Sequence, residues 1–431
     1  MLCTLRASVL RFCTRRSRRS LQPRSQRELS SLFGMDDLRT CCITLAGPRG
    51  MIGWMSRCRL LVTGATALAS LLPMRARAQE SAPLLDPAIV RAAFIPRIND
   101  GTFRGIAAGW RERDSILIAA AGVATVAGAT LTADTRFELG EAASVFTAAL
   151  LANLVARGEL SLDDEAQRFM PGTITLPTKN GRAITLGDLA FHRSGLPDLR
   201  TDGTGSAPER VARALRGVTL RSDIGSRYAF SQLGLDVLGL ALARQTKLPL
   251  AAAIRARVLQ PLGLSDIALL TAQPRTPSDA LGYGTDGRRV SRSSAAQGTW
   301  SASVMALSQF LAAASDTGRG PLASTFALMM RTRSLGPEPA LPVALGWRVF
   351  RLDGRDIYWL DAQDVPGFAA YLALDPSRNR SVAVLSNTAR PVDAIAGQLL
   401  LGRVPVITPA PTADPTAFMK SRSSSRRPGR R

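Results

Sequence analysis

The sequence has one histidine and five cysteines, and this scarcity excludes several kinds of site. All five cysteines lie within the first 58 residues, so residues 79–431 contain no thiol for a disulfide, a metal site or a nucleophile. His192 alone cannot build a zinc site, which leaves only a carboxylate site for a hard cation. We therefore expect neither a metal nor a cofactor.

Lysine is equally scarce, because the chain has only Lys179, Lys247 and Lys420. None of them follows a Ser or Thr by three residues, so a serine nucleophile activated by a lysine one helical turn away cannot occur. A Ser-His-Asp triad would have to use His192, and no G-x-S-x-G accompanies it. The Ser-Lys design is thus excluded, and the triad lacks its usual motif.

The positive charge is concentrated at the two ends of the chain. The formal net charge is +22, but residues 1–78 hold 14 Arg against 3 acidic residues, and residues 405–431 hold 6 basic residues against 1. The sequence between them shows no basic, aromatic-bearing segment of the kind that binds nucleic acid. We expect no nucleic-acid partner, and we expect residues 405–431, which have no apolar periodicity, to be a disordered basic tail.

A short apolar run near residue 60 has the order of a signal peptide. A basic segment over residues 55–59 precedes 13 mostly apolar or small residues, and Ala76-Arg77-Ala78 then offers an A-x-A cleavage site before Gln79. The run is too short to span a bilayer. We expect residues 55–78 to be a signal peptide, residues 1–54 to be an over-extended, disordered leader, and the mature protein to be periplasmic or secreted. An Arg- and Ser-rich transit peptide over residues 1–34 is the alternative.

Several segments occur in the order of a known family. The run 139–147 (LGEAASVFT) opens an apolar helix, and residues 157–164 read RGELSLDD. Residues 184–197 contain FHRSGLP, residues 260–266 read QPLGLSD, and residues 366–387 supply PGF, LDP and VLSN. The ordered set resembles the serine β-lactamase and penicillin-binding-protein superfamily, in its class C and esterase-like branch. The resemblance extends from about residue 91 to about residue 404.

The expected fold is α/β and β-lactamase/transpeptidase-like. The resemblance implies an antiparallel sheet flanked by helices, plus an all-α subdomain, with the active-site cleft between them. Strand patterns at both ends of the sequence and helical patterns between them agree with one sheet built from both ends. We expect one domain over residues 79–404, with a sheet part over about 85–158 and 300–404 and a helical part over about 159–300.

The resemblance also implies three pairs of catalytic residues, and this sequence departs from all three. The nucleophile segment has a carboxylate in place of the Ser and a hydroxyl in place of the Lys. The second pair is a Tyr and an Asn in the family. Here Phe230 lacks the phenol hydroxyl, and the amide of Gln232 is one methylene longer than that of Asn. The third pair, on the facing strand, has a carboxylate in place of the cation. The substituted positions are Glu141, Ser144, Phe230, Gln232, Asp361 and Gln363. We expect no intact catalytic set.

These substitutions lead to expectations about the chemistry of the cleft. Glu141 should lie at a helix N-terminus. In the family, backbone N–H groups hold the oxyanion of the reaction, and the Glu141 carboxylate could fill this former oxyanion hole. Asp361 should then be the carboxylate with the more raised pKa, and the cleft should prefer cationic or neutral ligands to anions. Tyr228 is interpreted as a packing residue, and His192 as a buried, hydrogen-bonded residue of a structural turn.

Three functional hypotheses remain open. The favoured one is an exported, catalytically inactive protein with a binding or accessory role at the cell envelope, whose partner is a small molecule or a cell-wall-related ligand. The alternative is a hydrolase with a rewired active site that uses Glu141 and Asp361 as paired carboxylates. The third is a purely structural scaffold. The sequence does not predict the oligomeric state.

Overall fold

The computed structural model describes residues 84–407, except for 126–127, 202, 271–278, 291–298, 332 and 336–340. The leader and signal peptide expected over residues 1–78 lie outside the described residues, as does the expected tail from residue 408 onward.

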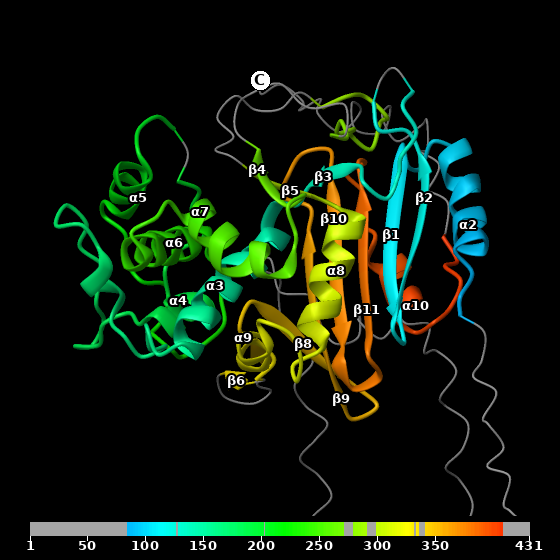
Figure 1. Ribbon diagram of the computed structural model, residues 1–431. Helices are drawn as coiled ribbons and strands as arrows, with labels where there is room; N and C mark the ends of the chain where they lie inside the picture. The colour runs from blue at the N-terminus through cyan, green and yellow to red at the C-terminus, as the bar shows by residue number, and fades with distance from the viewer. Residues whose placement is uncertain are drawn as a thin grey trace, which may run out of the picture. The chain divides into compact units, whose positions relative to one another are not determined.

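An antiparallel sheet of 8 strands joins the two ends of the described chain (Figure 1). Its order is β2-β1-β11-β10-β9-β8-β7-β6. The early strand β1 pairs with the late strand β11, with Ile106 opposite Ser386. The sequence expectation of one sheet built from both ends is confirmed. The bounds are β1 Gly105–Glu112, β2 Ser115–Gly122, β6 Arg333–Leu335, β7 Leu341–Ala344, β8 Trp347–Leu352, β9 Arg355–Ala362, β10 Ala369–Asp375 and β11 Arg380–Ser386.

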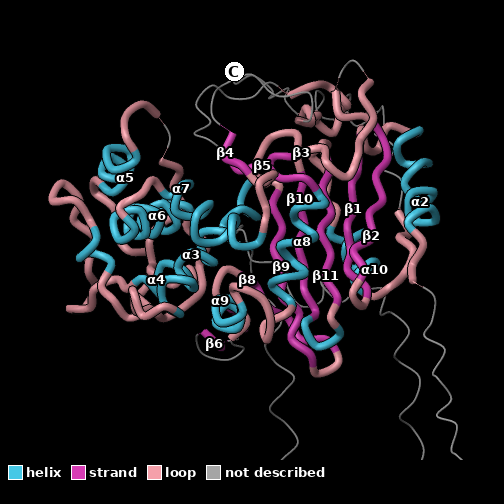
Figure 2. Tube along the Cα trace, viewed as in Figure 1, coloured by secondary structure: helices cyan, strands magenta, loops and turns pink. Residues whose placement is uncertain are grey.

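Helices cover both faces of this sheet, because alternate residues of its central strands are apolar on each side. On β11, Val382 and Val384 pack in one hydrophobic cluster with α2 (Pro87–Asn99) and α10 (Asp393–Leu400). Ala383 and Leu385 pack on the opposite face, in the cluster that contains α8 (Val304–Ser315). Figure 2 shows α8 across one face and α2 beside β2. Helix α2 begins at Pro87, because Asp86 caps it and Pro87 occupies its first turn.

A group of helices forms the other part of the domain and lies to one side of the sheet (Figure 1). Its members are α4 (Leu186–Ala190), α5 (Ala207–Leu215), α6 (Gln232–Thr246) and α7 (Leu250–Ile254), which continues as a π-helical turn to Leu259. The observed architecture is the predicted one, with an antiparallel sheet flanked by helices and a separate helical part.

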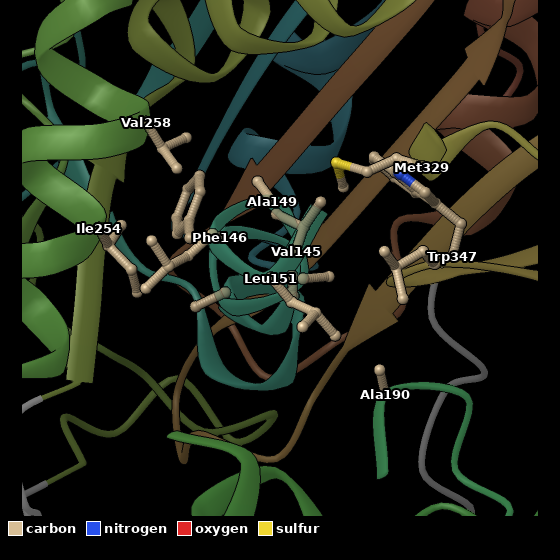
Figure 3. Close-up of a cluster of buried hydrophobic side chains, with 14 of the residues drawn as sticks. Val145, Phe146, Ala149, Leu151, Ala190, Ile254, Val258, Met329 and Trp347 are labelled. Carbon is tan, nitrogen blue, oxygen red and sulfur yellow. The ribbon is translucent and has the colours of Figure 1, made fainter. Parts of the chain in front are cut away.

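Helix α3 (Ser144–Ala156) connects the two parts, and its burial explains its composition. Ten of its 13 residues are buried, which requires apolar residues all around the helix. Figure 3 shows Phe146 of α3 beside Ile254 and Val258, and Val145 on the side of Met329 and Trp347. The last two belong to α9 (Ala323–Met329) and β8. This packing fixes the start of α3 between the helical part and the sheet.

A second sheet of three short strands positions the segment before α3. Its order is β3 (Arg136–Glu138), β5 (Thr299–Ser303) and β4 (Ala268–Leu270). The backbone N–H of Leu139 donates to the carbonyl of Trp300 at 2.9 Å. A 3-10 turn, η1 (Gly140–Ala143), then leads directly into α3. Residues 139–147 are therefore held at both ends.

No single helix in the described part of the chain is long and apolar enough to cross a membrane. Two consecutive helical segments reach the required length and composition only when they are counted together. They are Gln232–Thr246 and Leu250–Leu262, and the angle between them is 69°.

Candidate functional site

A pocket lies where the start of α3 meets the helical part and the sheet. It has an empty volume of about 550 Å³, which includes its open mouth. Helical segments supply one wall, and β7, β8 and β9 supply the other. The lining is mostly apolar and aromatic, with few polar groups, as is usual for small-molecule sites. Its polar and aromatic members are Glu141, Ser144, Phe191, His192, Tyr228, Phe230, Trp347, Arg348 and Asp361.

The structure brings four of the six predicted site residues into this pocket. Glu141 and Ser144 reach it from η1 and the first residue of α3, Phe230 from the loop before α6, and Asp361 from β9.

The remaining two predicted residues are not among those that line it. Gln232 begins α6 and donates from its side chain to Asp236 Oδ1 at 2.9 Å. Gln363 follows β9 and is exposed. Both residues follow the sequence pattern, but neither lines the pocket.

Among the carboxyl groups that the structure describes, Glu141 has the most altered pKa. Burial raises its pKa from 4.5 to about 7, and the neighbouring carboxylates of Asp364, Asp198 and Asp361 act in the same direction. Arg348 opposes them but does not outweigh the burial. The expectation that Asp361 would be the carboxylate with the more raised pKa is wrong, because the pKa that burial raises is that of Glu141.

Arg348 is the principal site residue that the sequence analysis missed. Its Nη1 lies 2.6 Å from Asp361 Oδ1, and its Nε lies 3.5 Å from the hydroxyl of Tyr228. Its guanidinium also lies 5.1 Å from the ring centroid of Trp359. The loss of the expected cation is therefore partly compensated, because a cation enters from β8. In the β8–β9 register Arg348 is opposite Trp359, which makes Asp361 its diagonal neighbour.

Tyr228 lines the pocket, and its hydroxyl faces Arg348. Its role is therefore not limited to the packing that the sequence analysis assigned to it. Burial lowers the pKa of the Arg348 guanidinium, whereas Tyr228, Asp361 and Glu141 raise it by a larger amount. The pKa of Arg348 is therefore raised overall. The guanidinium is therefore a permanent cation and cannot act as a general base.

His192 is held in the aromatic wall of the pocket. Its ring centroid lies 4.7 Å from that of Phe230 and 5.6 Å from that of Tyr228. Its Nδ1 accepts from the backbone N–H of Ser231 at 3.4 Å, which agrees with the expected hydrogen-bonded role in a turn. Burial, with Arg348 nearby, lowers its pKa to about 3. The imidazole is therefore neutral at physiological pH.

The backbone amide of Glu141 already has an acceptor. Its N–H donates to Asp364 Oδ1 at 2.8 Å, across 223 positions of sequence. The expectation that Glu141 itself fills the former oxyanion position is therefore wrong, because the side chain of Asp364 occupies that N–H. Sequence reasoning could not identify Asp364, since no motif spacing connects residues so far apart.

The polar groups of this pocket do not form a nucleophile and base of the family type. No lysine is among the described residues that line the pocket with Ser144, and Asp361 is paired with Arg348. Within the described residues, no group of three His, Cys, Asp or Glu side chains is placed to hold a metal ion. The arrangement offers one carboxyl group with a pKa near 7, the hydroxyls of Ser144 and Tyr228, one fixed cation and an apolar, aromatic surface.

Comparison with known proteins agrees with the fold and the ordered segments. A family model described as Beta-lactamase matches residues 90–402. Esterase EstB of Burkholderia gladioli is 34% identical over 165 residues, which are 34% of this chain and 42% of the esterase. Penicillin-binding protein 4 of Amycolatopsis lactamdurans is 27% identical over 286 residues, which are 60% of this chain and 74% of that protein.

Another relative is the D-alanyl-D-alanine-carboxypeptidase/endopeptidase AmpH of Escherichia coli (strain K12). It is 29% identical over 140 residues, which are 31% of this chain and 36% of AmpH. The alignments therefore span less than half the length of EstB and of AmpH.

Two solved structures share the fold. The octameric penicillin-binding protein homologue from Pyrococcus abyssi superimposes with a TM-score of 0.64 at 21% identity, covering 74% of this chain and 78% of that one. A class C beta lactamase from Rhodobacter sphaeroides gives 0.61 at 22% identity, covering 72% and 96%. With the family model matched over most of the described residues, this protein belongs to the beta-lactamase family.

Proposed function

We propose that this protein is an exported, catalytically inactive member of its family that binds a small molecule in the pocket at the start of α3. The observation that carries the proposal is the pairing of Asp361 with Arg348 at 2.6 Å in a pocket that has no lysine. The pair holds both charges in place, so neither group is available to move a proton. Glu141 stands at the nucleophile position, where a carboxylate is a poor acyl acceptor.

The composition of the pocket supports a binding role. Phe230, Tyr228 and Trp347 provide aromatic surface, and Glu141 provides a carboxylate with a pKa of about 7. A ligand with an aromatic or aliphatic body and a cationic or neutral polar end would match this lining better than an anion. A peptide-like or cell-wall-related compound is one class that combines these features, and AmpH and penicillin-binding protein 4 are relatives whose names point toward it.

A role at the cell envelope follows from the export signal expected over residues 55–78. Binding without turnover would make the protein a carrier, a sensor or an accessory subunit there.

The charge preference can be tested with three probes of nearly the same shape. Isothermal calorimetry on the full chain would compare 2-phenylethylamine, 2-phenylethanol and phenylacetate. We expect the amine to bind best at pH 8, where Glu141 is largely ionised, and the anion to bind worst. Glu141→Gln should remove the advantage of the amine, and Asp163→Asn, at an exposed carboxylate outside the pocket, should not. Tight binding of phenylacetate that Glu141→Gln leaves unchanged would contradict the proposal.

A second function is favoured by one observation, the pKa of about 7 at Glu141. General bases work best when their pKa lies near the operating pH, and Glu141 shares its pocket with the hydroxyl of Ser144. A hydrolase that used this carboxylate would show a rate that rises through about pH 7 and is abolished in Glu141→Gln. The paired-carboxylate version, with Asp361 as the partner acid, is less favoured because Arg348 holds Asp361.

A further inference from the structure

We propose that Asp364 is a built-in anionic occupant of the Glu141 amide, and that this occupancy prevents the pocket from taking anionic ligands. The inference rests on the proposed binding function and names the residue that sets its charge preference.

The contact is made at the position where an anion would otherwise bind. Glu141 lies in η1, which continues into α3, so its N–H is one of the first amides of a helical segment that ends at Ala156. Such amides lack intrahelical acceptors and attract negative charge. Asp364 Oδ1 lies 2.8 Å from this nitrogen, a normal length for a charge-assisted hydrogen bond.

The residue before Glu141 is shaped for the same contact. Gly140 has φ +52, and a Cβ at this position would overlap Asp364 Oδ1. Any side chain here would therefore both strain the backbone and displace the carboxylate. Gly140 thus provides the space that Asp364 uses to reach the amide.

A second group holds Asp364 from the solvent side. Arg200 Nη2 lies 3.6 Å from Asp364 Oδ2 and 3.4 Å from the Asp364 carbonyl. The side chain of Arg200 is 61% exposed, so its charge is screened by water and only partly neutralises the carboxylate. The second largest cause of the raised pKa of Glu141 is accordingly Asp364.

These contacts have a direct consequence for a ligand. A carboxylate or a developing oxyanion that enters the pocket finds the Glu141 amide occupied, and it meets the negative charge of Asp364 beside that amide. A neutral ligand meets no such obstacle, and a cationic ligand meets the charge of Arg348 only as part of its pair with Asp361. The same side chain would also withhold this amide from any tetrahedral intermediate.

The test compares three variants with phenylacetate as the probe, measured by calorimetry on the full chain. Asp364→Ala frees the amide, and we expect a gain in affinity of about tenfold or more. Asp364→Asn keeps an acceptor on the amide, so its gain should be much smaller. Asp198→Ala is the matched control, because it removes another carboxylate near Glu141 while leaving the amide occupied. An equal gain in all three variants would overturn the proposal, since charge alone would then explain it.

A second measurement does not depend on any ligand. Amide hydrogen exchange of Glu141 should be slow in the wild-type protein and in Asp364→Asn, and at least about tenfold faster in Asp364→Ala. Equal exchange in the wild-type protein and the Ala variant would show that the hydrogen bond is absent and overturn the inference. Wild-type turnover of an ester would instead contradict the proposed inactivity and leave this exchange result standing.

Discussion

Arg348 and Asp361 form an ion pair across neighbouring strands, with Nη1 and Oδ1 at 2.6 Å, inside a pocket that otherwise has mostly apolar walls. Arg348 on β8 supplies the cation, and Asp361 on β9 supplies the carboxylate, that these two strands present to the pocket. Both side chains are between a quarter and a third exposed, at 31% and 25%. The pair therefore lies between the surface regime and the buried regime of ion-pair energetics.

Removal of one partner should destabilise the fold by an intermediate amount. We expect Arg348→Met to lower the free energy of unfolding by about 1–2 kcal/mol, more than a surface pair and less than a fully buried one. A double-mutant cycle with Asp361→Asn, measured by urea unfolding, would give the coupling energy. Arg351→Met is the control, because Arg351 pairs with Asp356 on the same two strands but is 72% exposed. Equal effects of the two Arg changes would contradict the assigned role.

The raised pKa of Glu141 predicts a pH-dependent stability. Its pKa is 4.5 when the side chain is solvated and about 7 in the folded protein. The folded state thus holds a proton between these values that the unfolded state releases, so the contribution to stability is fully present below about pH 4.5 and is lost as the pH rises through about 7.

Glu141→Gln should therefore remove the loss of stability that the wild-type protein shows as the pH rises. After allowance for solvent screening, we expect the variant to exceed the wild-type unfolding free energy by on the order of 2 kcal/mol at pH 8 and to match it at pH 4. Denaturant unfolding at the two pH values would check this, with Asp163→Asn as a control at an exposed carboxylate. If the difference in unfolding free energy between the variant and the wild type were the same at both pH values, the pKa of Glu141 would not be raised.

Gly346 should be intolerant of a side chain. It lines the pocket at the turn between β7 and β8, has φ +76, and a Cβ there would overlap the Cβ of Ala148 in α3. We expect Gly346→Ala to cost about 2–4 kcal/mol, from backbone strain and overpacking together. Gly354→Ala is a matched control at the other end of β8, where φ is +77 and no atom lies within 4 Å. Thermal unfolding of both variants would separate the two causes, and equal costs would exclude the steric one.

Hydrolysis should be absent and should not be easily restored. We expect no turnover of nitrocefin or short-chain p-nitrophenyl esters above background, and no labelling by a fluorescent penicillin. The double change Glu141→Ser with Ser144→Lys rebuilds the nucleophile pair but leaves Phe230 and the Arg348–Asp361 pair in place. Partial acylation without turnover is the most we expect from it. Wild-type ester hydrolysis that is lost in Glu141→Ala or Ser144→Ala would show that the site is catalytic.

Export should produce a mature chain that begins at Gln79. This prediction rests on the order of three features, which are a basic segment, a short apolar run and Ala76-Arg77-Ala78. Mass spectrometry of protein recovered outside the cytoplasm would give the terminus. Recovery of an intact N-terminus at Met1 or Met55 would contradict export, and Ala78→Glu should block cleavage if the interpretation holds.

The sequence alone was enough for the fold class and for the identity of the central substitutions. Strand patterns are local, and the order of the segments between residues 139 and 387 is linear information, so both could be followed along the chain. That strands from both ends of the sequence share one sheet followed from the same reasoning, and the structure added that β1 pairs with β11. Glu141, Ser144, Phe230 and Asp361 were placed in the pocket by their position in the motifs.

The tertiary structure decided which charges meet. Arg348 lines the pocket, Asp364 accepts from the Glu141 amide, and Gln232 and Gln363 do not line the pocket. The raised pKa belongs to Glu141. These outcomes depend on burial and on distances of a few ångströms between side chains that are far apart in the chain. Coulomb and desolvation energies act through space and change steeply over such distances, so no spacing of residues along the sequence could have revealed them.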